Sequence, residues 1–378
     1  MRFEVSVCDV CNTPGEGTKI TADQMRKAAK AGFSPFSSDY AGLSRLETWR
    51  AMVQANDTNW NLCGECLRKV GAYLPASLES AARLPELPGS RVLAGHEERL
   101  MDVDISAAGD RVLTSGWDKT VRLWDFATGR QLACLRDHNS FVDAVALSPD
   151  GRFAASGGGG DYAIRIWDLE RQKVVHRLKG HSFTVFSLQF SRDGSRLLSG
   201  GDQTVQLWDV RAGKRIRKFG GMFGPKHQSG VMSVAFSPDE TQAFSVGLNA
   251  ILWDVESGKQ VRALAPTPLW SGAFLADGRR AIVSGSRGFT LFDLGSGAEL
   301  ATVNGVRAES GRFGLIRGGP QLFSGRFGTV RLVNINSGEE YFKAEGHSKS
   351  VTGVAVSADG RRGASASDDW TGRTWQFP

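Results

Sequence analysis

Two pairs of cysteines near the amino terminus have the spacing of metal ligands. Cys8 and Cys11 are separated by two residues, and so are Cys63 and Cys66. A C-x-x-C loop lets two thiolates point at one ion, and two such loops complete the all-sulfur tetrahedron that Zn²⁺ prefers. No histidine precedes His96, so mixed cysteine and histidine ligation within this segment is excluded. The spacing therefore predicts one structural zinc ion held by these four cysteines.

Two disulfides or a redox-active C-x-x-C motif are the alternatives for these cysteines. Two pairs within the first 66 residues fit one closed metal site, and a redox motif is not expected twice. A closed four-cysteine site has no open coordination position. We therefore expect the metal to support folding rather than catalysis.

The elements around the cysteines define a small helical module over residues 1–84. Capping-box signals predict helices over residues 22–31 and 44–55, and the second cysteine pair, from Cys63, opens a further helix. A ligand knuckle followed by a second pair at a helix start resembles treble-clef zinc fingers. Residues 85–89 hold two prolines and form the predicted linker to the rest of the chain.

The composition is that of an ordinary globular protein. The 378 residues are 41% hydrophobic and 23% charged, and no run of 18 or more uncharged apolar residues occurs. The amino terminus carries acidic residues where a signal peptide would be apolar, so we expect a cytoplasmic protein with no membrane partner. The formal net charge of +6 is mild, and no dense basic stripe marks a nucleic-acid site.

From residue 90 onward the sequence repeats with a period of about 42 residues. A Trp-Asp pair, or a weaker version of it, recurs seven times, with first members 43, 41, 45, 39, 41 and 42 residues apart. These first members are Trp124, Trp167, Trp208, Trp253, Phe292, Val333 and Trp375. A histidine precedes five of them by 26 to 29 residues. Alternating apolar runs separated by Gly and Asp turns predict four short strands in each unit.

This pattern resembles the WD40 repeat, whose four-stranded blades recur every 40 to 45 residues with a G-H…W-D signature. The resemblance covers residues 90–378. It implies a mainly β fold, a seven-bladed WD40 β-propeller, preceded by the small helical zinc-binding domain. Only three residues follow Trp375, so the last unit lacks its outer strand. We expect residues 90–94 to pair into this last blade and to close the ring.

The resemblance also assigns a hydrogen-bonded tetrad to most blades: a loop His, a Ser or Thr of the second strand, a turn Asp and the Trp of the third strand. The matching tetrads are His96, Thr114, Asp118 and Trp124; His138, Ser156, Asp161 and Trp167; His181, Ser199, Asp202 and Trp208; and His347, Ser365, Asp369 and Trp375. Ser, His and Asp together could form a hydrolase triad. A catalytic set would not recur in every blade, however, and the tetrad position takes five of the six histidines. We therefore expect a structural role and no enzymatic activity.

Propellers of this family commonly bind peptides or protein segments on the face where the innermost strands begin. The residues one step after the leading apolar position of those strands are Met101, Asp143, Phe186, Met232, Trp270 and Thr352. Met and aromatic side chains dominate this ring, and such side chains suit interfaces, although packing between blades is the alternative. Trp117, Tyr162 and Trp370 flank the turn aspartates, so we expect them to be exposed as well.

These observations predict a non-enzymatic scaffold that recruits a protein or peptide partner on the propeller face and is monomeric on its own. The alternative is a nucleic-acid-binding adaptor that uses the zinc module and a basic segment. This segment, residues 211–218, holds Arg211, Lys214, Arg215, Arg217 and Lys218. A solvated outer strand also explains its charges. A steep loss of binding with salt would distinguish the adaptor from the scaffold.

Overall fold

The computed structural model describes residues 18–20, 60–62, 90–220, 227, 229–264, 269–285, 288–303, 313–316 and 321–377. The chain divides into two units, Met1–Leu87 and Pro88–Pro378. In the first unit, β1 (Thr18–Ile20) pairs antiparallel with β2 (Trp60–Leu62), with Thr18 opposite Leu62. The sequence analysis did not predict these two strands. The four cysteines and the predicted helices lie outside the described residues.

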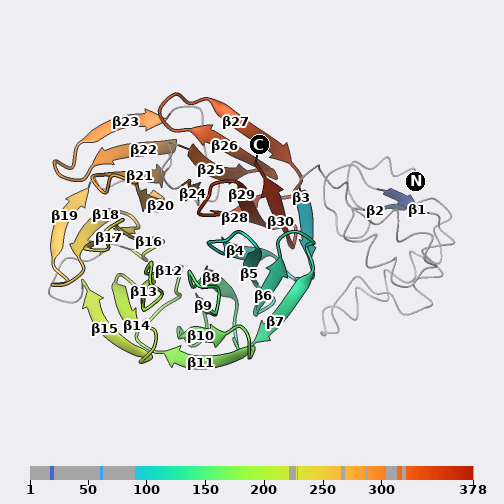
Figure 1. Cartoon of the computed structure of the whole chain (residues 1–378), viewed down its shortest axis with the longest axis horizontal. Coiled ribbons are helices and arrows are strands. Elements are labelled where there is room, and N and C mark those ends of the chain that lie inside the picture. Colours follow the sequence, from blue (N-terminus) through green and yellow to red (C-terminus); the bar gives the residue numbers. More distant parts are fainter. Residues whose placement is uncertain are drawn as a thin grey trace. The chain divides into compact units, whose positions relative to one another are not determined.

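Seven four-stranded antiparallel sheets form a closed ring in the second unit, which confirms the seven-bladed propeller (Figure 1). The first blade consists of β4 (Leu100–Ile105), β5 (Arg111–Gly116), β6 (Thr120–Asp125) and β7 (Gln131–Arg136). The second consists of β8 (Val142–Leu147), β9 (Phe153–Gly158), β10 (Ile164–Asp168) and β11 (Lys173–Leu178). The third consists of β12 (Ser187–Phe190), β13 (Arg196–Gly200), β14 (Val205–Asp209) and β15 (Lys214–Phe219).

The remaining blades repeat this order from the innermost to the outermost strand. The fourth consists of β16 (Ser233–Phe236), β17 (Gln242–Val246), β18 (Ala250–Asp254) and β19 (Gln260–Leu264). The fifth consists of β20 (Leu269–Phe274), β21 (Arg280–Gly285), β22 (Gly288–Asp293) and β23 (Glu299–Val303). The sixth consists of β24 (Phe313–Leu315), β25 (Gln321–Arg326), β26 (Thr329–Asn334) and β27 (Glu340–Glu345). The seventh combines β28 (Val351–Val356), β29 (Arg362–Ser367) and β30 (Thr371–Gln376) with β3 (Ser90–Ala94).

The seventh blade is built from both ends of the propeller segment. Ser90 lies opposite Trp375 and Ala94 lies opposite Thr371, so β3 is the outer strand of the last blade, as expected from the sequence. The ladder gives the last blade a fourth strand like every other blade. It also covers an edge of β30 that would otherwise be open to pairing with another chain.

Large apolar side chains fill the space between neighbouring blades. The Trp of each strong repeat, for example Trp124 or Trp208, is almost fully buried. In the two weak repeats, Phe292 and Val333 occupy the same place and are equally buried. Burial of an apolar side chain is thus what each repeat requires at this position, and the indole is one way to provide it. This explains why repeat spacing identified blades whose Trp-Asp signature is lost.

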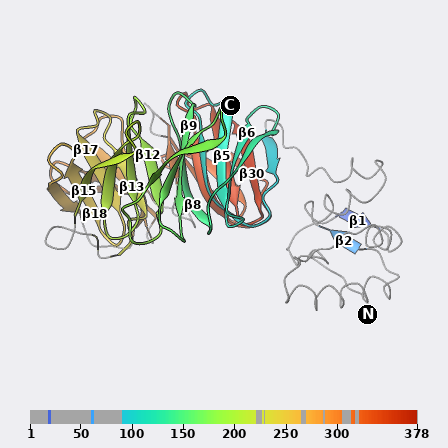
Figure 2. The same cartoon turned by 90° about the horizontal axis from the view of Figure 1, so that it is seen from below.

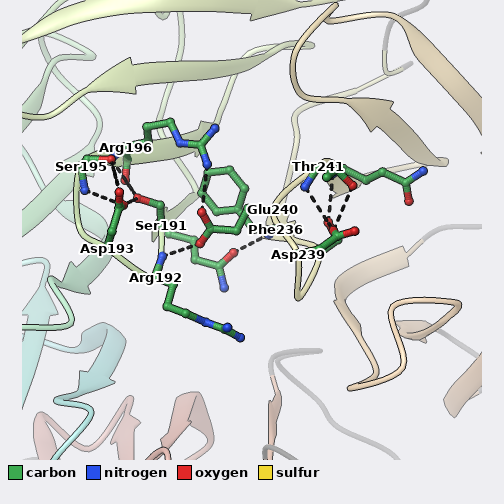
Figure 3. Close-up of polar contacts among 12 residues, drawn as sticks. Ser191, Arg192, Asp193, Ser195, Arg196, Phe236, Asp239, Glu240 and Thr241 are labelled. Atoms are coloured by element: carbon green, nitrogen blue, oxygen red, sulfur yellow. Dashed lines mark hydrogen bonds and ion pairs between the residues drawn. The ribbon is translucent and has the colours of Figure 1, made fainter.

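The strand order gives the propeller two faces, between which the strands of every blade run (Figure 2). We call the face that carries the second-to-third-strand turns and the connections between blades the top face. The innermost strands begin there. The bottom face carries the first-to-second-strand and third-to-fourth-strand turns. In the third blade, one such bottom turn is held by the Ser191 hydroxyl, which donates to Asp193 over 2.7 Å (Figure 3).

Candidate functional site

Three of the predicted tetrads form complete hydrogen-bonded chains. In the first blade, His96 Nδ1 lies 2.8 Å from Asp118 Oδ2, and Nε2 lies 2.7 Å from Thr114 Oγ1. The Trp124 indole N–H donates to the same Thr114 oxygen over 2.8 Å. The third and seventh blades repeat these contacts through His181, Ser199, Asp202 and Trp208, and through His347, Ser365, Asp369 and Trp375.

Burial and charge explain why these tetrads are structural. Burial alone would raise the pKa of Asp118, but hydrogen bonds from His96 and Thr120 hold it well below its usual range. An ionised carboxylate can only accept, so His96 Nδ1 is the donor, and Nε2 accepts the Thr114 hydroxyl proton. Thr114 has no exposed surface, so its hydroxyl cannot reach a substrate. The geometry is that of a buried brace between a loop and two strands.

The second blade departs from the predicted tetrad. His138 Nε2 lies 2.7 Å from Ser156 Oγ, and the Trp167 indole N–H donates to that oxygen over 2.7 Å. Asp161, however, binds the Arg165 guanidinium through both oxygens, at 2.7 and 2.8 Å. His138 Nδ1 is buried and has no hydrogen-bond partner among the described residues. The prediction that Asp161 completes this tetrad is therefore wrong, because the turn holds one more glycine and a buried arginine captures the carboxylate.

The residues predicted to ring the central channel share one backbone feature. Met101, Asp143, Trp270 and Thr352 are each skipped in the pairing of their inner strand with the next one, so each is the extra residue of a β-bulge. A bulge re-aims the side chain it carries and is common beside functional sites. Asp143 is only 5% exposed, whereas Met101, Trp270 and Thr352 are half-buried.

The third and fourth blades place their ring residues in the same way. The Phe186 N–H donates to Gly200 O over 2.9 Å, although Gly200 already pairs with the residue after Phe186. The Met232 N–H likewise donates to Val246 O over 2.7 Å. Phe186 is half-buried and Met232 is 36% exposed. Six inner strands thus begin with a residue of this ring on the top face.

Exposed apolar side chains gather on the top face. Among the described residues, eleven large hydrophobic side chains are exposed. Six of them lie in top-face turns or connections: Trp117, Phe141, Phe183, Met232, Leu248 and Phe327. The other five lie one each on the outer strands β11, β15, β19, β23 and β27, and none lies in a bottom-face turn. The two faces therefore differ sharply in apolar surface, although their turns are similar in number.

Aromatic stacks on the top face join neighbouring blades. Trp117, in a turn of the first blade, stacks on Phe141 of the connection into the second blade, with ring centroids 5.3 Å apart. The guanidinium carbon of Arg99 lies over the Trp117 ring, 3.5 Å from its centroid. Tyr162 of the second blade stacks in the same way on Phe183 of the connection into the third blade, at 6.0 Å.

Trp117 and Tyr162 were expected on this face from the sequence, whereas Phe141 and Phe183 were not. A signal for both was present, because each aromatic residue follows a tetrad histidine by two or three positions. Phe183 also contacts the predicted ring residue Phe186, with centroids 6.4 Å apart. The stack of Tyr162 and Phe183 therefore continues to a residue of the predicted ring.

Several top-face turns hold bulky residues in a left-handed backbone conformation. Tyr162, Phe327 and Trp370 have φ angles of 54°, 45° and 71°. Glycine adopts these angles without strain, whereas a bulky side chain there costs about 1–2 kcal/mol. Trp370 and Tyr162 are half-buried, and Phe327 is 66% exposed, so packing recovers little of this cost at Phe327. Strained residues of this kind cluster at binding sites.

The basic segment of residues 211–218 is mostly part of the outer strand β15. The Arg215 guanidinium donates to Gln206 over 3.1 Å, and Arg217 reaches the Ser257 carbonyl of the neighbouring blade at 3.4 Å. These two side chains brace the propeller. Only three cations of the segment are left for a phosphate backbone, which is few for nucleic-acid binding.

Within the part of the chain that the structure describes, no three potential metal-ligating side chains cluster together. Cys8, Cys11, Cys63 and Cys66 lie outside that part. The described residues also contain no helix that could cross a membrane.

The ring of four-stranded blades, the tetrads and the Trp-Asp strands define a β-propeller of the WD40 class. The family model described as "WD domain, G-beta repeat" matches residues 89–125, 129–168, 172–209, 217–254 and 338–376. The chain belongs to this family. The matched stretches leave out the fifth blade and the first three strands of the sixth, although both sheets have four strands.

Several characterised proteins are similar to this chain. The guanine nucleotide-binding protein subunit beta of Zea mays is 31% identical over 225 residues, which are 56% of this chain and 59% of that protein. The small ribosomal subunit protein RACK1 of Caenorhabditis elegans is 27% identical over 163 residues, 43% of this chain and 35% of that protein. The chain thus spans less than two thirds of the length of these relatives.

Proposed function

We propose that this chain is a non-enzymatic scaffold that recruits a protein partner through the top face of its propeller. The observation that carries the proposal is the set of aromatic residues held in left-handed turns of that face. At Phe327, glycine would relieve strain and little packing would be lost, so stability does not account for the aromatic ring. Binding does.

Two further observations support a protein partner. Exposed Trp, Phe and Met side chains gather on the top face, and aromatic residues with Arg supply most of the energy of protein interfaces. The related proteins bear the names of a guanine nucleotide-binding protein subunit and a small ribosomal subunit protein, so both are components of assemblies. The tetrad hydroxyls are buried and offer no nucleophile for a reaction.

Affinity capture from the source cells, after nuclease treatment, tests the proposal. One variant combines Trp117→Ala, Phe183→Ala and Phe327→Gly. The matched control combines Val175→Ser, Ile216→Ser and Leu300→Ser, which removes similar exposed apolar surface from outer strands. Both must melt as cooperatively as the wild type. We expect quantitative mass spectrometry to find a protein that the control retains and the top-face variant loses. Equal recovery by both variants, or recovery of nucleic acid alone, would contradict the proposal.

We further propose that Cys8, Cys11, Cys63 and Cys66 hold one structural Zn²⁺ ion. The C-x-x-C spacing supports this, and so does the pairing of β1 with β2, which joins the residue before Cys63 to the segment that follows the first cysteine pair. Metal analysis of the full chain should give one zinc per molecule. Cys63→Ser should lower that ratio, whereas Cys134→Ser, a free cysteine of the propeller, should not. A zinc-free wild type would contradict this assignment.

A further inference from the structure

The inner strands of the propeller enclose a cavity of about 560 Å³. All seven inner strands contribute to its wall. The cavity reaches the bottom face, where each blade begins its first turn. In six of these turns, the second residue after the inner strand lines the mouth of the cavity. These residues are Ala107, Pro149, Arg192, Pro238, Ala276 and Ala358. Five of these are small and apolar, and the sixth is an arginine.

Arg192 is an exposed residue whose main chain is bonded and whose guanidinium has no partner among the described residues. Its backbone N–H donates to the Glu240 carboxylate, and the Arg196 guanidinium donates to the same carboxylate over 2.9 Å. Figure 3 shows the Arg192 guanidinium pointing away from this pair. Among the described residues that line the cavity, Arg192 is the only basic one.

The carboxylates of the cavity wall already have hydrogen-bond donors. Asp102 accepts the Val145 N–H over 3.0 Å, and Asp104 accepts the Leu147 N–H over 2.8 Å. Both therefore join the first blade to the second. Glu240 is paired with Arg196. The Arg192 guanidinium is the charged group of the wall that has no partner among the described residues.

We propose that the bottom mouth of the channel binds a carboxylate, and that Arg192 pairs there with an acidic side chain of an extended protein segment. The small apolar residues of the mouth would contact the apolar residues that flank this acid. A guanidinium matches a carboxylate with two parallel hydrogen bonds. Asp193 lies in the same turn as Arg192, and Asp239 lies in the corresponding turn of the fourth blade. Both would repel a dianionic phosphate more than a monoanionic carboxylate (Figure 3). A nucleic acid would also need several cations.

This site lies on the face opposite to the proposed partner surface, so either proposal can fail without the other. The methyl groups of Ala107, Ala276 and Ala358 stand at the mouth and serve as reporters in NMR spectra of the full chain with labelled alanine methyls. The probe is the end-blocked peptide acetyl-AVAEAVA-amide, and its control carries Gln in place of Glu. We expect the Glu peptide to shift all three methyl signals and to bind at least tenfold more tightly than the Gln peptide.

Two variants identify the residue responsible. Arg192→Gln keeps the backbone bond to Glu240 and should weaken binding of the Glu peptide at least tenfold. Arg361→Gln is the matched control, because Arg361 is an exposed arginine of a bottom-face turn and its hydrogen bonds to described residues are made by its backbone. This variant should bind as the wild type does. The proposal is overturned if both peptides bind equally, if Arg192→Gln has no effect, or if neither peptide shifts the three signals at millimolar concentration.

Discussion

Replacing Phe327 with glycine should leave the propeller almost as stable as the wild type while it weakens partner binding. The phenyl ring is 66% exposed, and the residue has a φ angle of 45°. Relief of the left-handed strain contributes about 1–2 kcal/mol in favour of glycine. The main losses are about 0.5–1 kcal/mol for the contact with the Arg326 guanidinium, 4.8 Å from the ring centroid, and about 0.5–1 kcal/mol of glycine entropy. The partial burial of the ring adds less than about 1 kcal/mol.

These contributions nearly cancel, so the free energy of unfolding should change by about 1 kcal/mol or less. Phe323→Ala, in the same blade, is the contrasting substitution. Phe323 is fully buried, and truncating a buried phenylalanine costs about 3–5 kcal/mol. In a thermal melt we expect Phe327→Gly to lie within about 4 °C of the wild type and Phe323→Ala to lie far below both.

The same two proteins are then compared in the affinity capture, below their melting temperatures. Phe327→Gly should recover less partner than the wild type, whereas Phe323→Ala should recover a normal amount per folded molecule. A melting temperature for Phe327→Gly as low as that of Phe323→Ala would show that the ring is a packing residue. Undiminished capture by a stable Phe327→Gly would show that its strain serves another purpose. Either result would refute the reasoning.

Three further predictions concern stability. Burial lowers the pKa of His138 to about 3 from 6.5, so the unfolded chain takes up the proton first as the pH falls. In denaturant titrations, the free energy of unfolding of the wild type relative to His138→Asn should therefore drop by about 2 kcal/mol between pH 7 and pH 5. Burial raises the pKa of Asp104 to about 7, so the folded chain takes up that proton first, and the wild type should gain stability relative to Asp104→Asn over the same pH range. These effects oppose each other in the wild type, so a pH dependence unchanged in either variant would contradict its assignment. Deletion of residues 90–94 removes the outer strand of the last blade and should lower the melting temperature of the whole propeller, and an unchanged melt would show that β3 is dispensable.

The propeller could be predicted from the sequence because one short pattern is repeated and each copy has a physical reason. Trp124 and its counterparts fill the space between blades, and the tetrad histidines hold a loop to two strands, so both residue types recur at fixed spacing. Even where the tryptophan is replaced by Val333, the period still indicated a blade. The sequence pattern thus carries the core of the fold and the number of blades.

The functional surface was only partly predictable, because it depends on contacts between different repeats. Trp117 and Tyr162 were identified from their turns, but their stacking partners belong to the next blade. The failure at Asp161 arises within one repeat, because Arg165 of the strand that follows the turn binds the carboxylate and one added glycine lengthens the turn. The free guanidinium of Arg192 could be recognised only once the inner strands had been placed around one cavity.

Site-specific photocrosslinking tests the central claim most directly. A benzophenone amino acid replaces Phe183, which is 54% exposed on the top face, or Ile216, which is 46% exposed on the outer strand of the same blade. Irradiation of living cells should attach a discrete protein to the chain from position 183 and leave position 216 without that product. A product formed equally from both positions, or from position 216 alone, would contradict the claim that the top face recruits the partner.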